Sequence, residues 1–156
     1  NASHLTDKMA DEGKTPLIFT ENNIVIGIIA VSDAIKSDAS AAIKNFKKLG
    51  MRVVMLTGDN PKTAFAVANM VGINEIKSGV KPDGKAAVIE ELKKQGRVIM
   101  IGDGINDAVA LTTADVGIAI GNGMDIAIES ANVVLTNTNL IDAVTHILNH
   151  LAQYYH

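Results

Sequence analysis

The sequence of 156 residues predicts an α/β domain with a mostly parallel sheet, and two patterns support this fold. Short apolar runs typical of buried strands alternate along the chain with segments whose apolar residues recur at helical spacing. Two of these runs end in similar polar loops, TGDN at residues 57–60 and GDGIND at residues 102–107. Parallel strands bring such loops together at the carboxyl edge of a sheet, where α/β proteins bind their ligands.

The first third of the chain predicts a linker, a hairpin and a helix. Residues 1–16 are polar, which is typical of a linker. Residues 17–20 and 24–31 are strand-like runs, and the three residues between them favour a hairpin turn. From Lys36 the apolar residues fall at helical spacing, and Gly50 is a typical stop after such a helix.

The middle of the chain repeats this alternation. Residues 51–56 form a short apolar run, as expected of a strand that is buried on both faces. Asn60 and Pro61 are typical of the N-cap and first residue of a helix. Asp83 is expected to cap a further helix, which carries Ala87, Val88 and Leu92 and ends at Gly96.

The last third predicts three strands, at residues 98–101, 116–120 and 132–135. An amphipathic helix that begins at Leu140 then closes the chain. Strands that alternate with helices in this way favour right-handed crossovers between parallel strands.

Composition excludes several classes of function. The net charge is −3 and aromatic residues make up 3% of the chain, so we expect no nucleic-acid partner. The absence of cysteine excludes disulfides and thiolate metal sites. The longest apolar run, residues 24–31, is far shorter than the roughly 20 residues of a membrane-spanning helix, so we expect this chain alone to be soluble.

The two polar loops carry the residues of greatest chemical interest. Asp103 and Asp107 can present oxygen ligands to one Mg²⁺, which prefers a few carboxylates together with phosphate and water. Thr57 offers a hydroxyl beside the flexible backbone of Gly58, and both can donate to phosphoryl oxygens. Lys85 can supply the positive charge that a transferring phosphoryl group requires. Asn106 adds a neutral donor to the second loop.

Each feature also has a simpler interpretation. A strand that ends in Gly and Asp is often only a turn, and Lys85 alone is typical of a solvated helix residue. The crowded polar side chains of GDGIND are harder to explain without a ligand, because they repel and desolvate one another. Together the loops and the lysine predict Mg²⁺-dependent phosphoryl transfer.

Four segments closely resemble the phosphorylation domain of P-type cation-transporting ATPases of the heavy-metal, copper-type subgroup. They are TGDN, the spaced Pro82 and Lys85, GDGINDAVAL, and GIAIGNGMDIAIESANVVL, and the resemblance spans residues 13–142. It implies a haloacid dehalogenase-like Rossmannoid fold of three layers. In that family ATP phosphorylates the aspartate of a DKTGT segment, and hydrolysis of the aspartyl phosphate drives ion movement through a membrane domain.

The resemblance also implies roles for single residues. Thr57 and Gly58 would hold phosphoryl oxygens, and Asp59 would organise their loop. Lys85 would neutralise the phosphate, Asp103 would bind Mg²⁺, and Asn106 with Asp107 would complete the phosphate and metal network. Three further positions match a hinge aspartate and a loop of backbone support: Asp33, Gly121 and Gly123.

The same resemblance predicts the domain organisation. Residues 1–31 would be the tail of the nucleotide-binding insertion with a returning hairpin, and residues 32–140 the phosphorylation domain. Residues 141–156 would form a C-terminal helix that leads toward the membrane in a full-length parent. We expect that parent to lie in the cell membrane with this domain on the cytoplasmic side.

The sequence departs from the family in one important respect, because DKTGT does not occur in the chain. Asp7 and Lys8 match only its first two letters, and no buried strand is predicted before them. The central strand that carries the nucleophile would therefore be missing, which leaves two apolar strand edges to be covered. We expect residues 24–31, or a strand from another chain, to close this gap.

The leading interpretation is a catalytic-domain portion of an ATP-driven heavy-metal transporter. It would supply Mg²⁺- and phosphate-binding residues, while ATP would be held mainly by the absent nucleotide-binding domain. We expect the isolated chain to form no phosphoenzyme, because electrostatics cannot replace a nucleophile. Its partners would be the rest of the transporter or a chain carrying the DKTGT strand, and a homodimer or strand swap stays open.

Two alternatives belong to other classes of protein. One is a stand-alone haloacid dehalogenase-like phosphatase with Asp33 as nucleophile, since Asp33 follows the apolar run that ends at Val31. The other is a non-catalytic module that pairs with a partner containing the missing strand.

Overall fold

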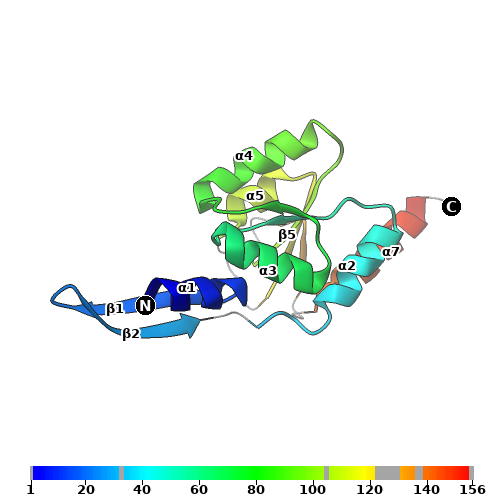
Figure 1. Cartoon of the computed structure of the whole chain (residues 1–156). Helices are drawn as coiled ribbons and strands as arrows, with labels where there is room; N and C mark the ends of the chain where they lie inside the picture. Colours follow the sequence, from blue (N-terminus) through cyan, green and yellow to red (C-terminus); the bar gives the residue numbers. More distant parts are fainter. Residues whose placement is uncertain (1, 32–33, 104–105, 122–130, 136–138, 155–156) are drawn as a thin grey trace.

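Helices and strands alternate along most of the chain in the computed structural model, which describes residues 2–31, 34–103, 106–121, 131–135 and 139–154 (Figure 1). In chain order the elements are α1 (Ala2–Asp11), β1 (Thr15–Glu21), β2 (Ile24–Val31), α2 (Ala39–Lys48), β3 (Val54–Leu56), α3 (Pro61–Val71), β4 (Glu75–Lys77), α4 (Pro82–Lys93), β5 (Ile99–Gly102), α5 (Ala108–Thr113), β6 (Val116–Ile120), β7 (Val133–Leu135) and α7 (Leu140–Tyr154). Among these described residues, no helix is long and apolar enough to span a membrane.

The parallel strands form two groups. β3 pairs with β4, and β5, β6 and β7 form a three-stranded sheet in that order, all in parallel register. β1 and β2 form a separate antiparallel hairpin. The predicted α/β fold with a mostly parallel sheet is therefore confirmed.

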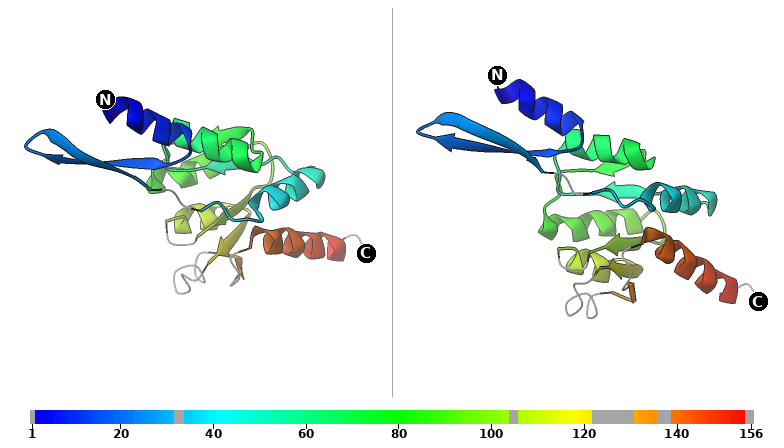
Figure 2. Two further views of the ribbon diagram at one scale, coloured as in Figure 1. Left: turned by 60° about the horizontal axis from the view of Figure 1, so that its bottom comes forward. Right: turned by 90° about the horizontal axis from the view of Figure 1, so that it is seen from below.

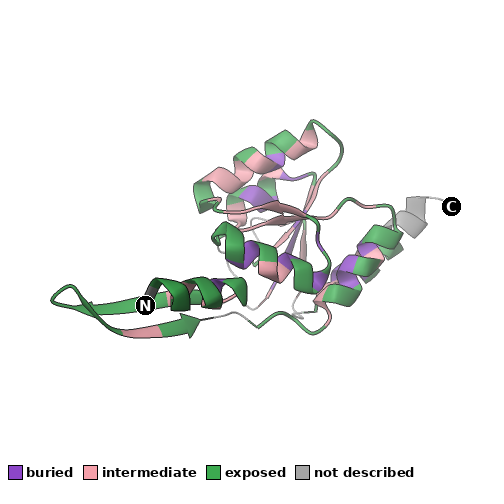
Figure 3. Ribbon diagram, viewed as in Figure 1, coloured by how far each residue is buried: buried purple, intermediate pink, exposed green. Residues whose placement is uncertain are grey.

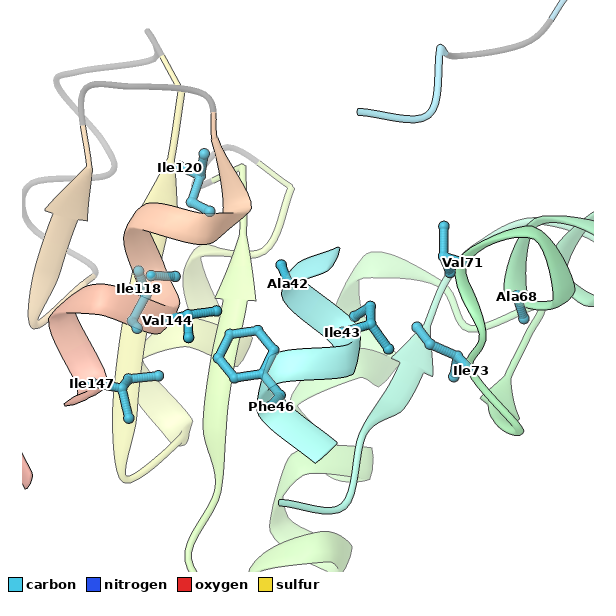
Figure 4. Packing of buried hydrophobic residues seen from close by; sticks show 11 residues of the cluster. Ala42, Ile43, Phe46, Ala68, Val71, Ile73, Ile118, Ile120, Val144 and Ile147 are labelled. Atoms are coloured by element: carbon cyan, nitrogen blue, oxygen red, sulfur yellow. The ribbon is translucent and has the colours of Figure 1, made fainter. Parts of the chain in front are cut away.

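Two hydrophobic cores lie on opposite faces of these sheets and define three layers. Along β6, Ile118 and Ile120 belong to the core shared with α2, α3 and α7, whereas Ala119 belongs to the core shared with α4 and α5. This alternation follows from the two-residue period of a strand. Figure 4 shows the first core, in which Phe46 of α2 lies beside Val144 and Ile147 of α7.

The two groups of parallel strands share both cores. Met55 of β3 and Ile101 of β5 pack in the first core. Their neighbours Leu56 of β3 and Met100 of β5 pack in the second. No hydrogen-bonded ladder joins β3 to β5 within the described part of the chain. The common layers nevertheless place the ends of β3 and β5 in the same middle layer of the domain.

The predicted closure of a central gap by residues 24–31 is wrong. These residues form β2, whose hydrogen-bonded partner is β1. Together with α1 the hairpin makes an arm (residues 2–31). In all three views the hairpin extends away from the parallel strands, whereas α1 packs against α3 (Figures 1 and 2). The turn between the strands occurs as predicted, with Asn22 and Asn23 at φ of 48° and 63°. Closure by a strand from another chain stays a prediction.

The arm exposes much of its apolar surface (Figure 3). Ile24 and Ile26 remain 67% and 64% exposed, although their run is the most apolar in the sequence. A two-stranded hairpin has no second layer of its own to cover such residues. Apolar character alone therefore predicted a strand correctly but its burial wrongly.

The polar start of the chain is a helix and not a linker. α1 buries Ala10 and packs against α3 as well as the hairpin. Lys62 of α3 also pairs with Asp7 of α1, with 3.0 Å between Nζ and Oδ1. Leu5, Met9 and Ala10 give α1 a narrow apolar stripe that its polar composition concealed.

The middle elements differ in detail from their predictions. The strand predicted over residues 51–56 is limited to β3, and β4 was not predicted because its three residues include two charged ones. α4 begins at Pro82 with Lys81 as N-cap, so Asp83 lies in the first turn and is not the cap. Proline with its fixed φ starts a helix readily.

The apolar side of α4 was predicted only in part, since Val88 and Leu92 are half-buried as expected. Ala87 is exposed, and the buried residue of this helix is Ile89, which is 3% exposed and belongs to the second core. The prediction gave Ala87 too much weight, because alanine is common on both faces of helices.

Arg52 links three elements at the edge of β3 and gives a testable pH dependence. Its guanidinium donates to both carboxylate oxygens of Glu75 in β4 and to Gln95 Oε1 after α4. The hydrogen bond from Arg52 lowers the pKa of Glu75 below its usual 4.5. A carboxyl group whose pKa is lowered by folding contributes stability above its unfolded pKa and loses it as pH falls through the folded one.

We expect Arg52→Met to lose stability relative to the wild type at pH 7, and the difference to shrink as pH falls below 4.5. Thermal melting of both proteins between about pH 7 and pH 3 measures this difference. A difference that stays constant over the whole range would show that Arg52 does not act through Glu75.

Candidate magnesium and phosphate site

The loop that follows β3 (the 57–60 loop) is closed on itself by hydrogen bonds. Thr57 Oγ1 donates to Asp59 Oδ2 at 2.9 Å and accepts from the Asp59 amide at 3.1 Å. Asp59 thus holds the Thr57 hydroxyl beside the backbone of Gly58. The Thr57 hydroxyl and the backbone of Gly58 therefore lie together at the carboxyl end of β3.

A second set of bonds fixes the same loop to the segment after β4. The Thr57 amide donates to the Lys77 carbonyl at 2.9 Å, and the Val80 amide donates back to the Thr57 carbonyl at 3.1 Å. The Gly79 amide donates to the Asp59 carbonyl at 2.8 Å, with Gly79 at a φ of +67° that favours glycine. β4, which was not predicted, therefore supports the 57–60 loop together with the residues that directly follow it.

Lys85 connects this part of the site to the loop after β5. It lies in the first turns of α4, and its Nζ donates to Asp107 Oδ1 at 2.5 Å. The two side chains are only 12% and 13% exposed, which makes this the most buried ion pair in the described part of the chain. The segment bonded to the 57–60 loop leads directly into α4, and Lys85 of α4 contacts Asp107. Residues 103–107 are called the 103–107 loop.

Gly102 allows Asp107 to occupy this position. A Cβ added at Gly102 would lie 2.6 Å from Asp107 Oδ2 and 2.9 Å from Asp107 Cβ, both well inside contact distance. Gly102 has no unusual φ, so the requirement for glycine is steric and not conformational. Sequence reasoning treated Gly102 only as the first residue of the GDGIND loop, although a glycine between a strand and an acidic loop was a signal of such a close approach.

The remaining site residues of the 103–107 loop are more exposed. Asp103 accepts a long hydrogen bond of 3.4 Å from the Asn106 amide, and both residues are exposed. Gly121 follows β6 at a φ of +131°, and its amide donates to the Leu135 carbonyl at 3.3 Å. Asp33 and Gly123 lie outside the described residues.

The donors present fit magnesium better than a metal that requires a complete protein cage. No group of three or more His, Cys, Asp or Glu side chains that could hold a metal is found among the described residues. Mg²⁺ needs only one or two carboxylates, because it retains water and takes oxygens from a bound phosphate. Asp103 and Asp107 on a single loop match this limited requirement.

The chain matches the family model described as haloacid dehalogenase-like hydrolase over residues 2–115. It is 45% identical to mouse copper-transporting ATPase 2 over 150 residues, which cover 94% of this chain and 10% of the relative. It is 48% identical to a silver exporting P-type ATPase of Salmonella typhimurium, covering 90% of this chain and 17% of that protein. A copper-transporting ATPase 1 of Rhizobium meliloti is 52% identical, over 86% of this chain and 16% of the relative.

Solved structures give the same result. The crystal structure of a zinc-transporting PIB-type ATPase superimposes with a TM-score of 0.75 and 39% identity, covering 92% of this chain and 24% of that one. The catalytic domain of the CPx-ATPase CopB-B superimposes with a TM-score of 0.65 and 28% identity, covering 86% and 57%. The chain spans between about a tenth and a sixth of the length of these curated relatives.

Proposed function

The chain belongs to the haloacid dehalogenase-like hydrolase family, and we propose that it supplies the Mg²⁺- and phosphate-binding part of an aspartyl-phosphate site. It is homologous to parts of copper- and zinc-transporting P-type ATPases, and to their catalytic domains in particular. The single observation that supports the proposal best is the largely buried ion pair of Lys85 with Asp107 in the second polar loop.

The proposed roles follow from the contacts of each group. Thr57 and Gly58 would donate to phosphoryl oxygens, while Asp59 holds the Thr57 hydroxyl in place. Lys85 would neutralise charge that develops on the transferring phosphoryl group, an effect that is large where water is largely excluded. Asn106 would donate a further hydrogen bond from the 103–107 loop.

Asp103 and Asp107 would hold Mg²⁺, which when bound supplies positive charge to the oxygens of the phosphoryl group. Asp107 lies against Lys85, so one carboxylate would serve both the lysine and the metal. ATP is the proposed phosphoryl donor, held mainly by a nucleotide-binding domain outside this chain.

The nucleophile would come from outside the 156 residues, because no DKTGT segment occurs among them. We propose that residues 1–31 are the tail of a nucleotide-binding insertion, residues 32–140 the phosphorylation domain, and residues 141–156 a helix that leads toward a membrane domain. The whole protein would be a heavy-metal transporter of copper type, with this part on the cytoplasmic side of the cell membrane. A separately made chain with the DKTGT strand, or strand exchange between two copies, would complete the site in the same way.

We expect Asp103→Asn to remove the dependence of phosphate binding on Mg²⁺. Binding of inorganic phosphate to the whole chain, measured by calorimetry with and without Mg²⁺, should strengthen with the metal in the wild type. In the variant the increase in phosphate affinity caused by Mg²⁺ should be smaller by about tenfold or more, because an amide is a far weaker ligand for a hard cation. Asp83→Asn is the matched control, since Asp83 is an exposed carboxylate of the first turn of α4. If Asp103→Asn keeps the full effect of Mg²⁺, Asp103 is not a metal ligand.

A further inference from the structure

Thr63 is the one buried polar residue among the described residues, with an exposed fraction of 3%. It lies in the first turn of α3, directly after the 57–60 loop. Burial of a hydroxyl is unfavourable unless its hydrogen-bonding capacity is used. The partners of Thr63 therefore indicate why a threonine is buried at this point.

Both ends of the Asn60 side chain are bound to Thr63. Asn60 Oδ1 accepts from the Thr63 amide at 3.0 Å, and Asn60 Nδ2 donates to Thr63 Oγ1 at 2.9 Å. The first bond is an ordinary N-cap, which any residue at position 63 except proline could provide through its backbone. The second bond requires a hydroxyl, and it prevents the Asn60 amide from rotating about its last torsion.

The same hydroxyl faces the arm. Thr63 Oγ1 lies 3.5 Å from the carbonyl oxygen of Lys14, which connects α1 to β1. Gly13 approaches α3 closely here, since a Cβ added to it would lie 3.5 Å from Val67 Cγ2. Thr63 is thus a junction of three segments: the 57–60 loop, α3 and the arm.

We propose that Thr63 is a positioning residue that fixes the 57–60 loop for phosphate through Asn60; the part of this inference that concerns phosphate rests on the proposed function. The loop is attached at two places. Its first residues are bonded to the segment after β4, and its last residue, Asn60, is bonded to Thr63. Backbone bonds hold Thr57 and Asp59, and the Ala64 amide donates to the Asn60 carbonyl at 3.0 Å. The Thr63 hydroxyl adds the bond that fixes the Asn60 side chain, and through it the end of the loop.

A purely structural role makes a different prediction. If Thr63 only caps α3 and fills space, its substitution should lower the stability of the domain and leave the phosphate affinity of the folded protein unchanged. If it positions the loop, the affinity of the folded protein should fall as well, because small displacements of positioning groups have large effects.

The test compares Thr63→Val, which keeps the shape and removes the hydroxyl, with Thr63→Ser, which keeps the hydroxyl. Thr145→Val is the matched control, because Thr145 is exposed on α7 and its hydroxyl donates to the Ile141 carbonyl of its own helix. Affinity for inorganic phosphate with Mg²⁺ is measured by calorimetry below the unfolding temperature of every variant. Amide hydrogen exchange of Gly58 and Asp59 is measured on the same proteins without phosphate.

We expect Thr63→Val to bind phosphate roughly tenfold more weakly and to exchange the Gly58 and Asp59 amides faster, with both properties restored in Thr63→Ser. Unchanged affinity and exchange in Thr63→Val would overturn the inference. If the wild type binds no phosphate, the proposed function fails, and the exchange rates alone still decide whether Thr63 fixes the loop. Faster exchange in Thr63→Ser as well as in Thr63→Val would overturn it too, because packing and not the hydroxyl would be responsible.

Discussion

Replacing Gly102 by alanine should disable the candidate site, because the added methyl group would take the place of the Asp107 side chain. The new Cβ would lie 2.9 Å from Asp107 Cβ and 2.6 Å from its Oδ2, so the side chain and its backbone must both move. Overpacking of this kind costs about 1–3 kcal/mol of stability. We expect the ion pair of Asp107 with Lys85 to break and phosphate affinity in the presence of Mg²⁺ to fall about a hundredfold.

Gly27→Ala is the matched control for this substitution. Gly27 also lies in a strand and has no positive φ, and no atom lies within 4 Å of a Cβ added there. We expect its stability and phosphate affinity to equal those of the wild type. Should Gly102→Ala bind phosphate as tightly as Gly27→Ala, the position of Asp107 would not matter for binding.

Replacing Lys85 by methionine should cause the second large effect. The substitution keeps the bulk of the side chain but leaves Asp107, which is 13% exposed, without its cation. Removing one partner of a buried ion pair destabilises a protein by about 3–5 kcal/mol, because the other charge remains uncompensated. We expect a loss near the lower end of this range, about 3 kcal/mol, in urea unfolding at neutral pH, since the pair is not completely buried.

Two further variants separate this effect from a general loss of charge. In the double variant Lys85→Met/Asp107→Asn the orphaned charge is gone, so its loss of stability should be smaller than the sum of the two single losses. Lys62→Met loses an exposed pair with Asp7, with side chains 53% and 58% exposed, and should cost far less than Lys85→Met. Equal losses in Lys85→Met and Lys62→Met would contradict the importance of the buried pair.

The sequence predicted the parallel core well because its signals there are local. β6 coincides with the predicted run at residues 116–120, and α3 has the predicted cap at Asn60 and first residue at Pro61. Each of these features depends on the period of apolar residues or on the chemistry of one or two positions. The two polar loops were found for the same reason, since each directly follows an apolar strand.

The features that were missed depend on contacts between distant segments. β4 is defined by pairing with β3 and not by its own residues, which are Glu75, Ile76 and Lys77. The role of Gly102 becomes visible only when the side chain of Asp107 lies over it. The hairpin of β1 and β2 was predicted from its turn, but the exposure of the apolar residues of β2 could not be read from hydrophobicity.

The central claim is that the 57–60 loop and the 103–107 loop form one site for phosphate and Mg²⁺. Amide NMR of the whole chain during a titration with inorganic phosphate and Mg²⁺ tests it most directly. We expect the signals of Gly58, Asp59, Asn106 and Asp107 to shift together along a single binding curve, and the signals of the arm strands to remain unchanged. Shifts confined to one loop, or separate curves with different affinities for the two loops, would contradict a common site.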